Sequence, residues 1–102
     1  MSDQFYQRNQ ILEIFECEEH FLDLLESEEL VVCSKMDPSG NKFYDVCQFE
    51  RIRIISNLTR ELDVNLPGVE VILQMRENMI SMRKQFDEIL HLLILELKNR
   101  VP

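Results

Sequence analysis

The stretch Leu66–Leu97, LPGVEVILQMRENMISMRKQFDEILHLLILEL, decides the fold of this chain. Its apolar side chains recur at alternating spacings of three and four residues, which is the a/d pattern of a coiled coil. Charged side chains occupy the other faces as far as Glu88. A single helix cannot bury such a seam alone, so the pattern predicts one long helix that pairs with a second copy of itself. The predicted dimerisation seam is Ile72, Met75, Met79, Met82, Phe86, Ile89 and Leu93.

Upstream of this helix, two short amphipathic segments predict a helix-turn-helix. The first is Asn9–Phe15, and the apolar pattern resumes at Phe21 after a break at Glu16–Glu19. Short helices joined by such a tight connection are typical of this motif.

A β-hairpin is predicted next. The β-branched run Leu30–Cys33 and the segment Lys42–Tyr44 flank Asp37–Asn41, whose sequence DPSGN is a strong turn signal. In a helix-turn-helix protein, a hairpin in this place forms the wing.

Asp45 is placed to cap the following helix, with Gln48 completing a capping box, and the helix is expected to run to about Leu62. Its expected core positions are Val46, Phe49, Ile52, Ile55 and Leu58. The sequence therefore predicts a mainly α fold: a winged helix-turn-helix domain over residues 1–65 and a long C-terminal dimerisation helix over residues 66–102.

The charge of the chain is distributed unevenly. Residues 1–50 hold three basic and twelve acidic side chains, a net charge of -9, whereas residues 51–102 hold eight basic and seven acidic side chains, a net charge of +1. The N-terminal half therefore repels phosphate backbones and favours a basic partner. A solubilising surface is the alternative reading of the same residues.

Several classes of protein are disfavoured by the composition. The three cysteines lie far apart without a Cys-x-x-Cys motif, and the spacing of Cys17 and His20 is weak evidence for a metal, so we expect no metal and no cofactor. With two glycines in total, the chain has no phosphate-binding loop, and no nucleophile stands near a base, so catalysis is not expected. No signal peptide is visible and the longest apolar run is too short to span a bilayer, which predicts a cytoplasmic protein.

Two sequence segments resemble the MerR-type winged-helix superfamily. Lys42–Asp45 followed by Phe49-Glu50-Arg51-Ile52 is similar to the wing-to-helix signature of that superfamily. The segment Leu58–Leu73, LTRELDVNLPGVEVIL, resembles the version found in heat-shock repressors of the HspR kind and in chaperone modulators of the CbpM kind. The first group binds operator DNA. The second binds the J-domain of a DnaJ-like co-chaperone of the CbpA type and inhibits it.

The second short helix favours the chaperone modulators. His20 and Asp23 fall where DNA-reading relatives commonly place arginine, and Phe43 replaces the arginine that usually precedes the tyrosine of the wing. Carboxylates would be repelled by every phosphate that the helix approached. J-domains carry a basic second helix, which an acidic surface could engage. The resemblance thus implies a partner-binding surface of Glu16, Glu19, His20, Asp23, Leu24, Glu26 and Phe43.

The function and the role of Leu24 stay open at this point. A DNA-binding repressor of the MerR/HspR class is the main alternative function, and a winged helix that only scaffolds another protein is a third possible function. Leu24 is either a partner contact or part of the core.

The role of the end of the long helix also stays open. This segment, Ile89–Leu97, is apolar nearly all round. It packs on the winged domain of a partner copy, builds a larger assembly or forms a second binding surface.

Overall fold

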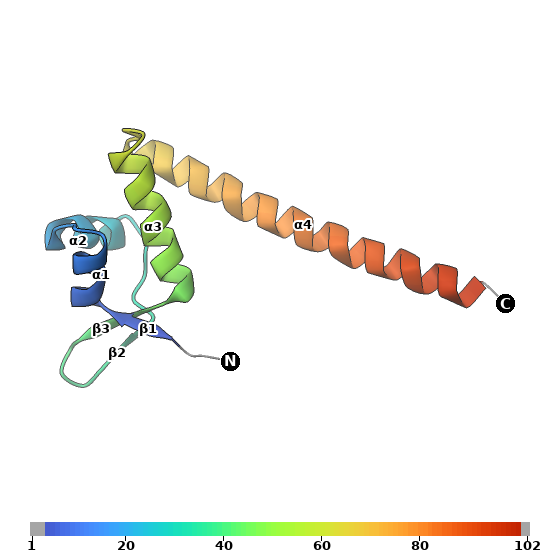
Figure 1. Ribbon diagram of the computed structural model, residues 1–102, viewed down its shortest axis with the longest axis horizontal. Helices are drawn as coiled ribbons and strands as arrows, with labels where there is room; N and C mark the ends of the chain where they lie inside the picture. Colours follow the sequence, from blue (N-terminus) through green and yellow to red (C-terminus); the bar gives the residue numbers. More distant parts are fainter. Residues whose placement is uncertain (1–3, 101–102) are drawn as a thin grey trace. The chain divides into compact units, whose positions relative to one another are not determined.

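The computed structural model describes residues 4–100 and has a mainly helical fold with one small sheet (Figure 1). Its chain forms two compact units that meet between Leu66 and Pro67. The first, here called the winged unit, is a winged helix-turn-helix, and the second is a single long helix, so the predicted fold class is confirmed. The elements in order are β1 (Phe5–Gln7), α1 (Arg8–Ile14), α2 (Glu19–Ser27), β2 (Lys35–Met36), β3 (Lys42–Asp45), α3 (Val46–Arg60) and α4 (Leu66–Arg100).

The sheet of the winged unit is antiparallel, with β3 between β1 and β2. Phe43 of β3 is opposite Gln7 on one side and Lys35 on the other. The wing turn forms where it was predicted: the Asp37 side chain accepts a hydrogen bond from the Asn41 backbone N–H at 2.8 Å. Gly40 there has a φ of 90°, which an L side chain rarely adopts.

The predicted strand Leu30–Cys33 is wrong. The backbone N–H groups of Leu30 and Val31 both donate to the carbonyl of Leu25 at the end of α2, at 2.9 and 3.4 Å. With their donors satisfied by the helix end, these residues form no ladder, and their side chains are buried in the core instead. The wing strand begins later, at Lys35.

Strand β1 was not predicted at all. Residues Phe5–Gln7 lie in a polar segment that carries no strand pattern of its own, and they become a strand because β3 offers them a pairing edge. The ring of Tyr6 stacks on that of Phe49 from α3, with centroids 4.2 Å apart. This strand leads directly into α1.

Helices α1 and α2 form the helix-turn-helix around buried Ile11, Leu22 and Leu25. The turn between them contains Glu16, whose φ of 49° is unusual for a residue other than glycine. The Arg60 guanidinium from the end of α3 stabilises this turn by donating to two of its carbonyls, that of Glu16 at 2.6 Å and that of Phe15.

Helix α3 is capped as predicted by Asp45, whose side chain accepts from the Gln48 N–H at 2.9 Å. The capping box is only half formed, because the Gln48 side chain instead accepts a hydrogen bond from the Val32 N–H at 3.0 Å. Ile52 and Ile55 are buried as expected. Phe49 and Leu58 are partly buried, whereas Val46 is 46% exposed and is not a core residue.

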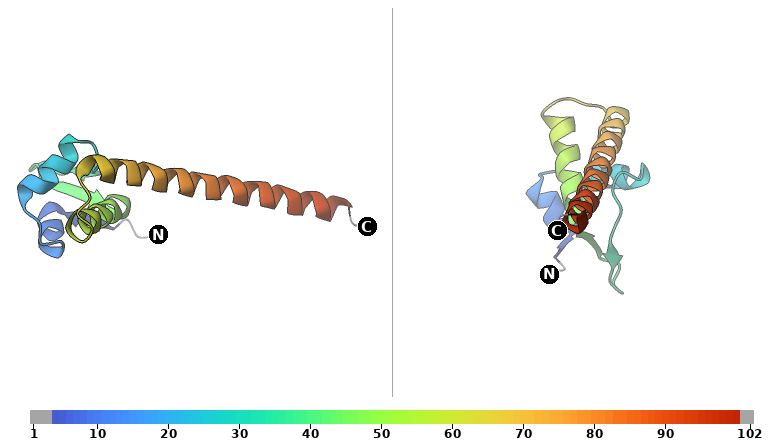
Figure 2. Two further views of the ribbon diagram at one scale, coloured as in Figure 1. Left: turned by 90° about the horizontal axis from the view of Figure 1, so that it is seen from above. Right: turned by 90° about the vertical axis from the view of Figure 1, so that its right-hand side faces the viewer.

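The long helix α4 runs without interruption from Leu66 to Arg100 and so extends past the apolar stretch that ends at Leu97 (Figure 2). Within it, Val69 and Leu73 are buried. The predicted seam is exposed in the single chain from Met75 onward, with Met79 at 69% and Phe86 at 63% exposure. Across residues 4–100, no helix combines the length and the apolar character needed to cross a membrane.

Candidate functional site

Helix α2 separates a buried face from an exposed one. Leu22 and Leu25 enter the core, so Leu24, which the sequence left ambiguous, lies outside it and is 41% exposed. Along the exposed face lie Glu19, His20, Asp23, Leu24 and Ser27. Among the nine residues of this helix there are three carboxylates and neither lysine nor arginine.

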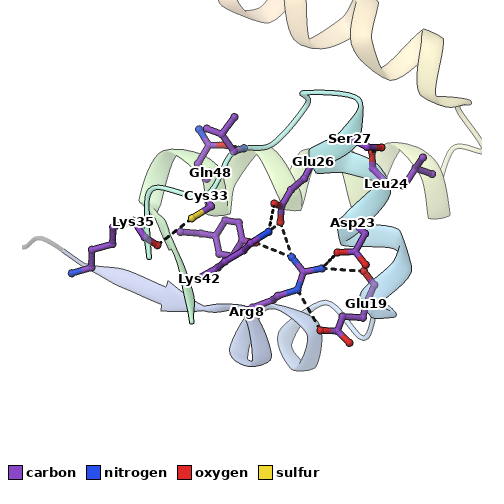
Figure 3. Close-up of polar contacts among 12 residues, drawn as sticks. Arg8, Glu19, Asp23, Leu24, Glu26, Ser27, Cys33, Lys35, Lys42 and Gln48 are labelled. Atoms are coloured by element: carbon purple, nitrogen blue, oxygen red, sulfur yellow. Dashed lines mark hydrogen bonds and ion pairs between the residues drawn. The ribbon is translucent and has the colours of Figure 1, made fainter. Parts of the chain in front are cut away.

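Arg8, the first residue of α1, forms ion pairs with all three of these carboxylates (Figure 3). Its Nη1 is 2.6 Å from Glu26 Oε1, its Nε is 3.5 Å from Glu19 Oε1, and its Nη2 contacts Asp23 Oδ1. Nη2 also donates to the main-chain carbonyl of Glu19 at 3.2 Å. The guanidinium therefore links the start of α1 to residues at the start, the middle and the end of α2 through charge-assisted contacts.

Glu26 has two further donors, both from β3. The Tyr44 hydroxyl donates to Oε1 and accepts from Arg8 Nη1 at 3.0 Å. Lys42 Nζ lies 2.9 Å from Oε2. We call this set the Arg8 cluster: Arg8, Glu19, Asp23, Glu26, Lys42 and Tyr44.

Exposure divides the cluster into an inner and an outer part. The side chains of Arg8 and Glu26 are only 14% and 17% exposed, whereas those of Glu19 and Asp23 are 69% and 67% exposed. Glu26 is therefore an internal residue of the winged unit. Glu19 and Asp23 meet Arg8 and still face solvent.

Burial and hydrogen bonding act in opposite directions on Glu26. Burial by itself would raise the pKa of Glu26, but the hydrogen bonds from Tyr44 and Lys42 and the positive charges of Lys42 and Arg8 outweigh it and lower the pKa below its usual value. Burial, followed by the hydrogen bond to Glu26, raises the pKa of Tyr44. The cluster thus holds Glu26 ionised and Tyr44 protonated at neutral pH.

A shallow depression of about 410 Å³ lies beside the start of α2. It is lined by Glu16, Cys17, Glu18, His20, Phe21, Thr59 and Arg60. His20 Nδ1 is 3.0 Å from Glu18 Oε2, and both side chains are 78% exposed. Burial raises the pKa of the Cys17 thiol, against the influence of Arg60, so the thiol stays protonated. Residues 4–100 contain no group of three or more side chains arranged to hold a metal ion.

The basic side chains of the winged unit also form contacts within the chain. In the described part of that unit, each of its arginines and lysines has a partner within the chain. The partners are carboxylates for Arg8, Lys42 and Arg53, main-chain carbonyls for Arg51 and Arg60, and aromatic rings for Lys35. The side chain of Arg53 is 48% exposed all the same, so its pairing leaves part of this charge at the surface.

The seven residues predicted to bind a partner fall into separate places. Glu19, Asp23 and Glu26 meet at Arg8, Glu16 and His20 line the depression, and Leu24 is exposed on α2. Phe43 lies in β3, where Lys35 Nζ approaches its ring at 5.4 Å, and among the described residues no hydrogen bond, ion pair or ring contact joins it to α2.

The contribution of Arg8, Lys42 and Tyr44 was missed from the sequence. One signal was available: Arg8 is the only lysine or arginine before Lys35, in a segment that carries nine acidic residues. An isolated cation in such surroundings is a natural internal counter-charge. Which carboxylates it meets depends on the packing of α1 against α2.

Comparison with known proteins places the chain in a family. Residues 6–91 match the family model described as MerR HTH family regulatory protein. No curated protein and no solved structure matches the chain. The matched segment includes the helix-turn-helix, the wing, α3 and most of α4. The chain therefore belongs to the MerR HTH family of regulatory proteins.

Proposed function

We propose that this chain is a chaperone modulator of the CbpM kind, which binds the J-domain of a DnaJ-like co-chaperone and inhibits it. The observation that carries the proposal is the chemistry of α2. This is the second helix of the helix-turn-helix, which DNA-binding relatives insert into the major groove, and here it presents carboxylates and neither lysine nor arginine.

Electrostatics supports a basic protein partner over DNA. Binding to DNA gains affinity when lysines and arginines neutralise phosphates and release counterions. Helix α2 has neither lysine nor arginine, and the charged side chains on its exposed face, Glu19 and Asp23, are carboxylates that stay mostly exposed. Opposite charges would steer a basic helix toward this face and raise the association rate.

Affinity requires apolar contact as well as charge. Leu24 is exposed beside Asp23 on α2, and in Figure 3 it points away from the Arg8 cluster. The partner-binding surface that we propose is therefore Glu16, Glu19, His20, Asp23 and Leu24. Glu26 is not part of this surface, because its own side chain is largely buried. It supports the surface by holding Arg8 in place.

A DNA-binding transcriptional regulator is the second candidate, since the matched family is one of regulatory helix-turn-helix proteins. It predicts a shift of DNA fragments near chaperone genes at physiological salt. Binding of that kind should weaken steeply as salt rises, in proportion to the number of phosphates neutralised.

The proposed function is tested by titrating the chain with a purified J-domain at low and physiological salt, using calorimetry. We expect binding that weakens with salt, and loss of co-chaperone activity in proportion to occupancy. In the variant His20→Lys a positive charge enters the exposed face while the contacts of Arg8 stay intact. Its affinity should fall by at least about tenfold, because like charges brought together across an interface cost several kcal/mol.

Gln85→Lys is the matched control, because it makes the same charge change at an exposed site on α4. Its affinity for the J-domain should equal that of the wild-type chain. Absence of J-domain binding at low salt would refute the proposed function, and equal losses in the two variants would place the binding surface elsewhere.

A further inference from the structure

We infer that Arg8 is a positioning residue, which fixes Glu19 and Asp23 so that they receive two basic side chains one helical turn apart on a partner helix. The inference rests on the proposed function in one respect, since it takes the partner to be a basic helix. Beyond the proposed function, it specifies the spacing of the basic residues on the partner helix and identifies Arg8 as the residue on which the preference for this spacing depends.

Arg8 contacts one oxygen of each of the two exposed carboxylates: Oε1 of Glu19 at 3.5 Å, and Oδ1 of Asp23. Among the described residues, none forms a hydrogen bond or ion pair with the second oxygen of either group. On its inner side Asp23 is thus held by a hydrogen bond from Arg8 and Glu19 by an ion pair with Arg8, and both carboxylates are open to a cation on the outer side.

Glu19 and Asp23 are four residues apart on α2, so they lie on one face about one turn apart. A partner helix laid along α2 meets both with lysine or arginine side chains at positions i and i+4 of its own sequence. Basic residues at i and i+2 point to different faces of their helix and reach only one carboxylate.

The side chain of Arg8 is fixed in position. It is 14% exposed and is held by Glu26 at 2.6 Å and by the Tyr44 hydroxyl at 3.0 Å. The planar guanidinium reaches all three carboxylates of α2 at once, which a lysine ammonium at the same site cannot reproduce. Anchoring both acceptors beforehand removes part of the ordering cost of binding.

The experiment uses two synthetic helical peptides of identical composition, with two lysines at i and i+4 or at i and i+2. Association and dissociation rates are measured at low salt for the full-length wild-type chain and for Arg8→Gln and Arg8→Lys. We expect the wild-type chain to bind the i, i+4 peptide about tenfold more tightly, the gain expected from two ordered side chains.

Both Arg8 variants should lose this preference, for separable reasons. Arg8→Gln removes a positive charge, so the association rate should rise, while the dissociation rate rises by about tenfold because the carboxylates are no longer anchored. Arg8→Lys keeps the positive charge but lacks the planar guanidinium that contacts all three carboxylates. Its association rate should match the wild-type rate, and its dissociation rate should remain raised.

Asp23→Asn tests the inference independently of whether the Arg8 variants fold, because it leaves the buried pair of Arg8 and Glu26 intact. It should abolish the preference for the i, i+4 peptide in a fully folded chain. Equal binding of the two peptides to the wild-type chain, binding of neither, or an unchanged preference in Arg8→Lys would overturn the inference. A preserved peptide preference without J-domain binding would refute the proposed function alone.

Discussion

At Glu26, three donors converge on one carboxylate that is 17% exposed: Arg8 and Tyr44 on Oε1 and Lys42 on Oε2. In the sequence Glu26 looks like the other acidic residues of its helix, and the pattern predicts it as part of the binding surface with them. The packing of β3 and α1 against α2 makes it internal. At the scale of single residues, the structure therefore divides one acidic helix into a structural carboxylate and two exposed ones.

Replacing Glu26 with glutamine should lower the free energy of unfolding at pH 7 by roughly 1–3 kcal/mol, because it leaves buried donors without a charged acceptor. The folded-state pKa of Glu26 lies below its usual value, so its stabilisation is present above the pKa of the unfolded chain and is lost as pH falls through the folded value. Urea unfolding at pH 7 and at a series of lower pH values measures this difference.

Glu13→Gln is the control for that comparison, since Glu13 is exposed on α1. It should change stability little at any of these pH values. A difference between wild type and Glu26→Gln that does not shrink as pH falls would mean that the charge of Glu26 is not what stabilises the cluster.

Among the elements, the start of α3 shows where local sequence rules suffice and where they fail. Asp45 caps the helix as the pattern requires, because a cap needs only a side chain and the N–H three residues ahead. Gln48 leaves the capping box for the Val32 N–H, a donor that only the folded chain brings near. The same loop carries Leu30 and Val31 into the core rather than into a strand.

Asp45→Ala should therefore lower the free energy of unfolding by about 1 kcal/mol, the typical cost of losing a helix N-cap. Asp45→Asn, which keeps an acceptor oxygen at the same place, should retain most of that stability. Denaturant unfolding of the two variants beside wild type measures the effect. Equal losses in both would show that the negative charge of Asp45, rather than its cap, provides the stabilisation.

For the whole molecule, the exposed seam of α4 leads to a prediction about assembly. Large apolar side chains stay exposed along most of this helix in the single chain, and exposed apolar stripes of this length mark interfaces. We expect a dimer formed through the predicted seam. Light scattering after size exclusion at micromolar concentrations should give the mass of two chains.

Phe86→Asp tests the seam directly, because it places a charge among residues that a partner helix would cover. It should weaken the dimer at least tenfold, whereas Ser81→Asp, which puts the same charge off the seam, should leave the mass unchanged. A monomeric wild-type chain at these concentrations would contradict the coiled-coil interpretation.

The sequence by itself determined the features that depend on neighbours along the chain: the long helix from its heptads, the wing turn from DPSGN, the cap of α3 and the MerR-like class. Only the tertiary structure decided which polar groups pair over distance. It added β1, moved Leu30 and Val31 into the core, and placed Arg8 among carboxylates 11 to 18 residues away. The physical reason is that helical periodicity and turn chemistry are local, whereas burial and charge pairing arise where packing brings distant segments together.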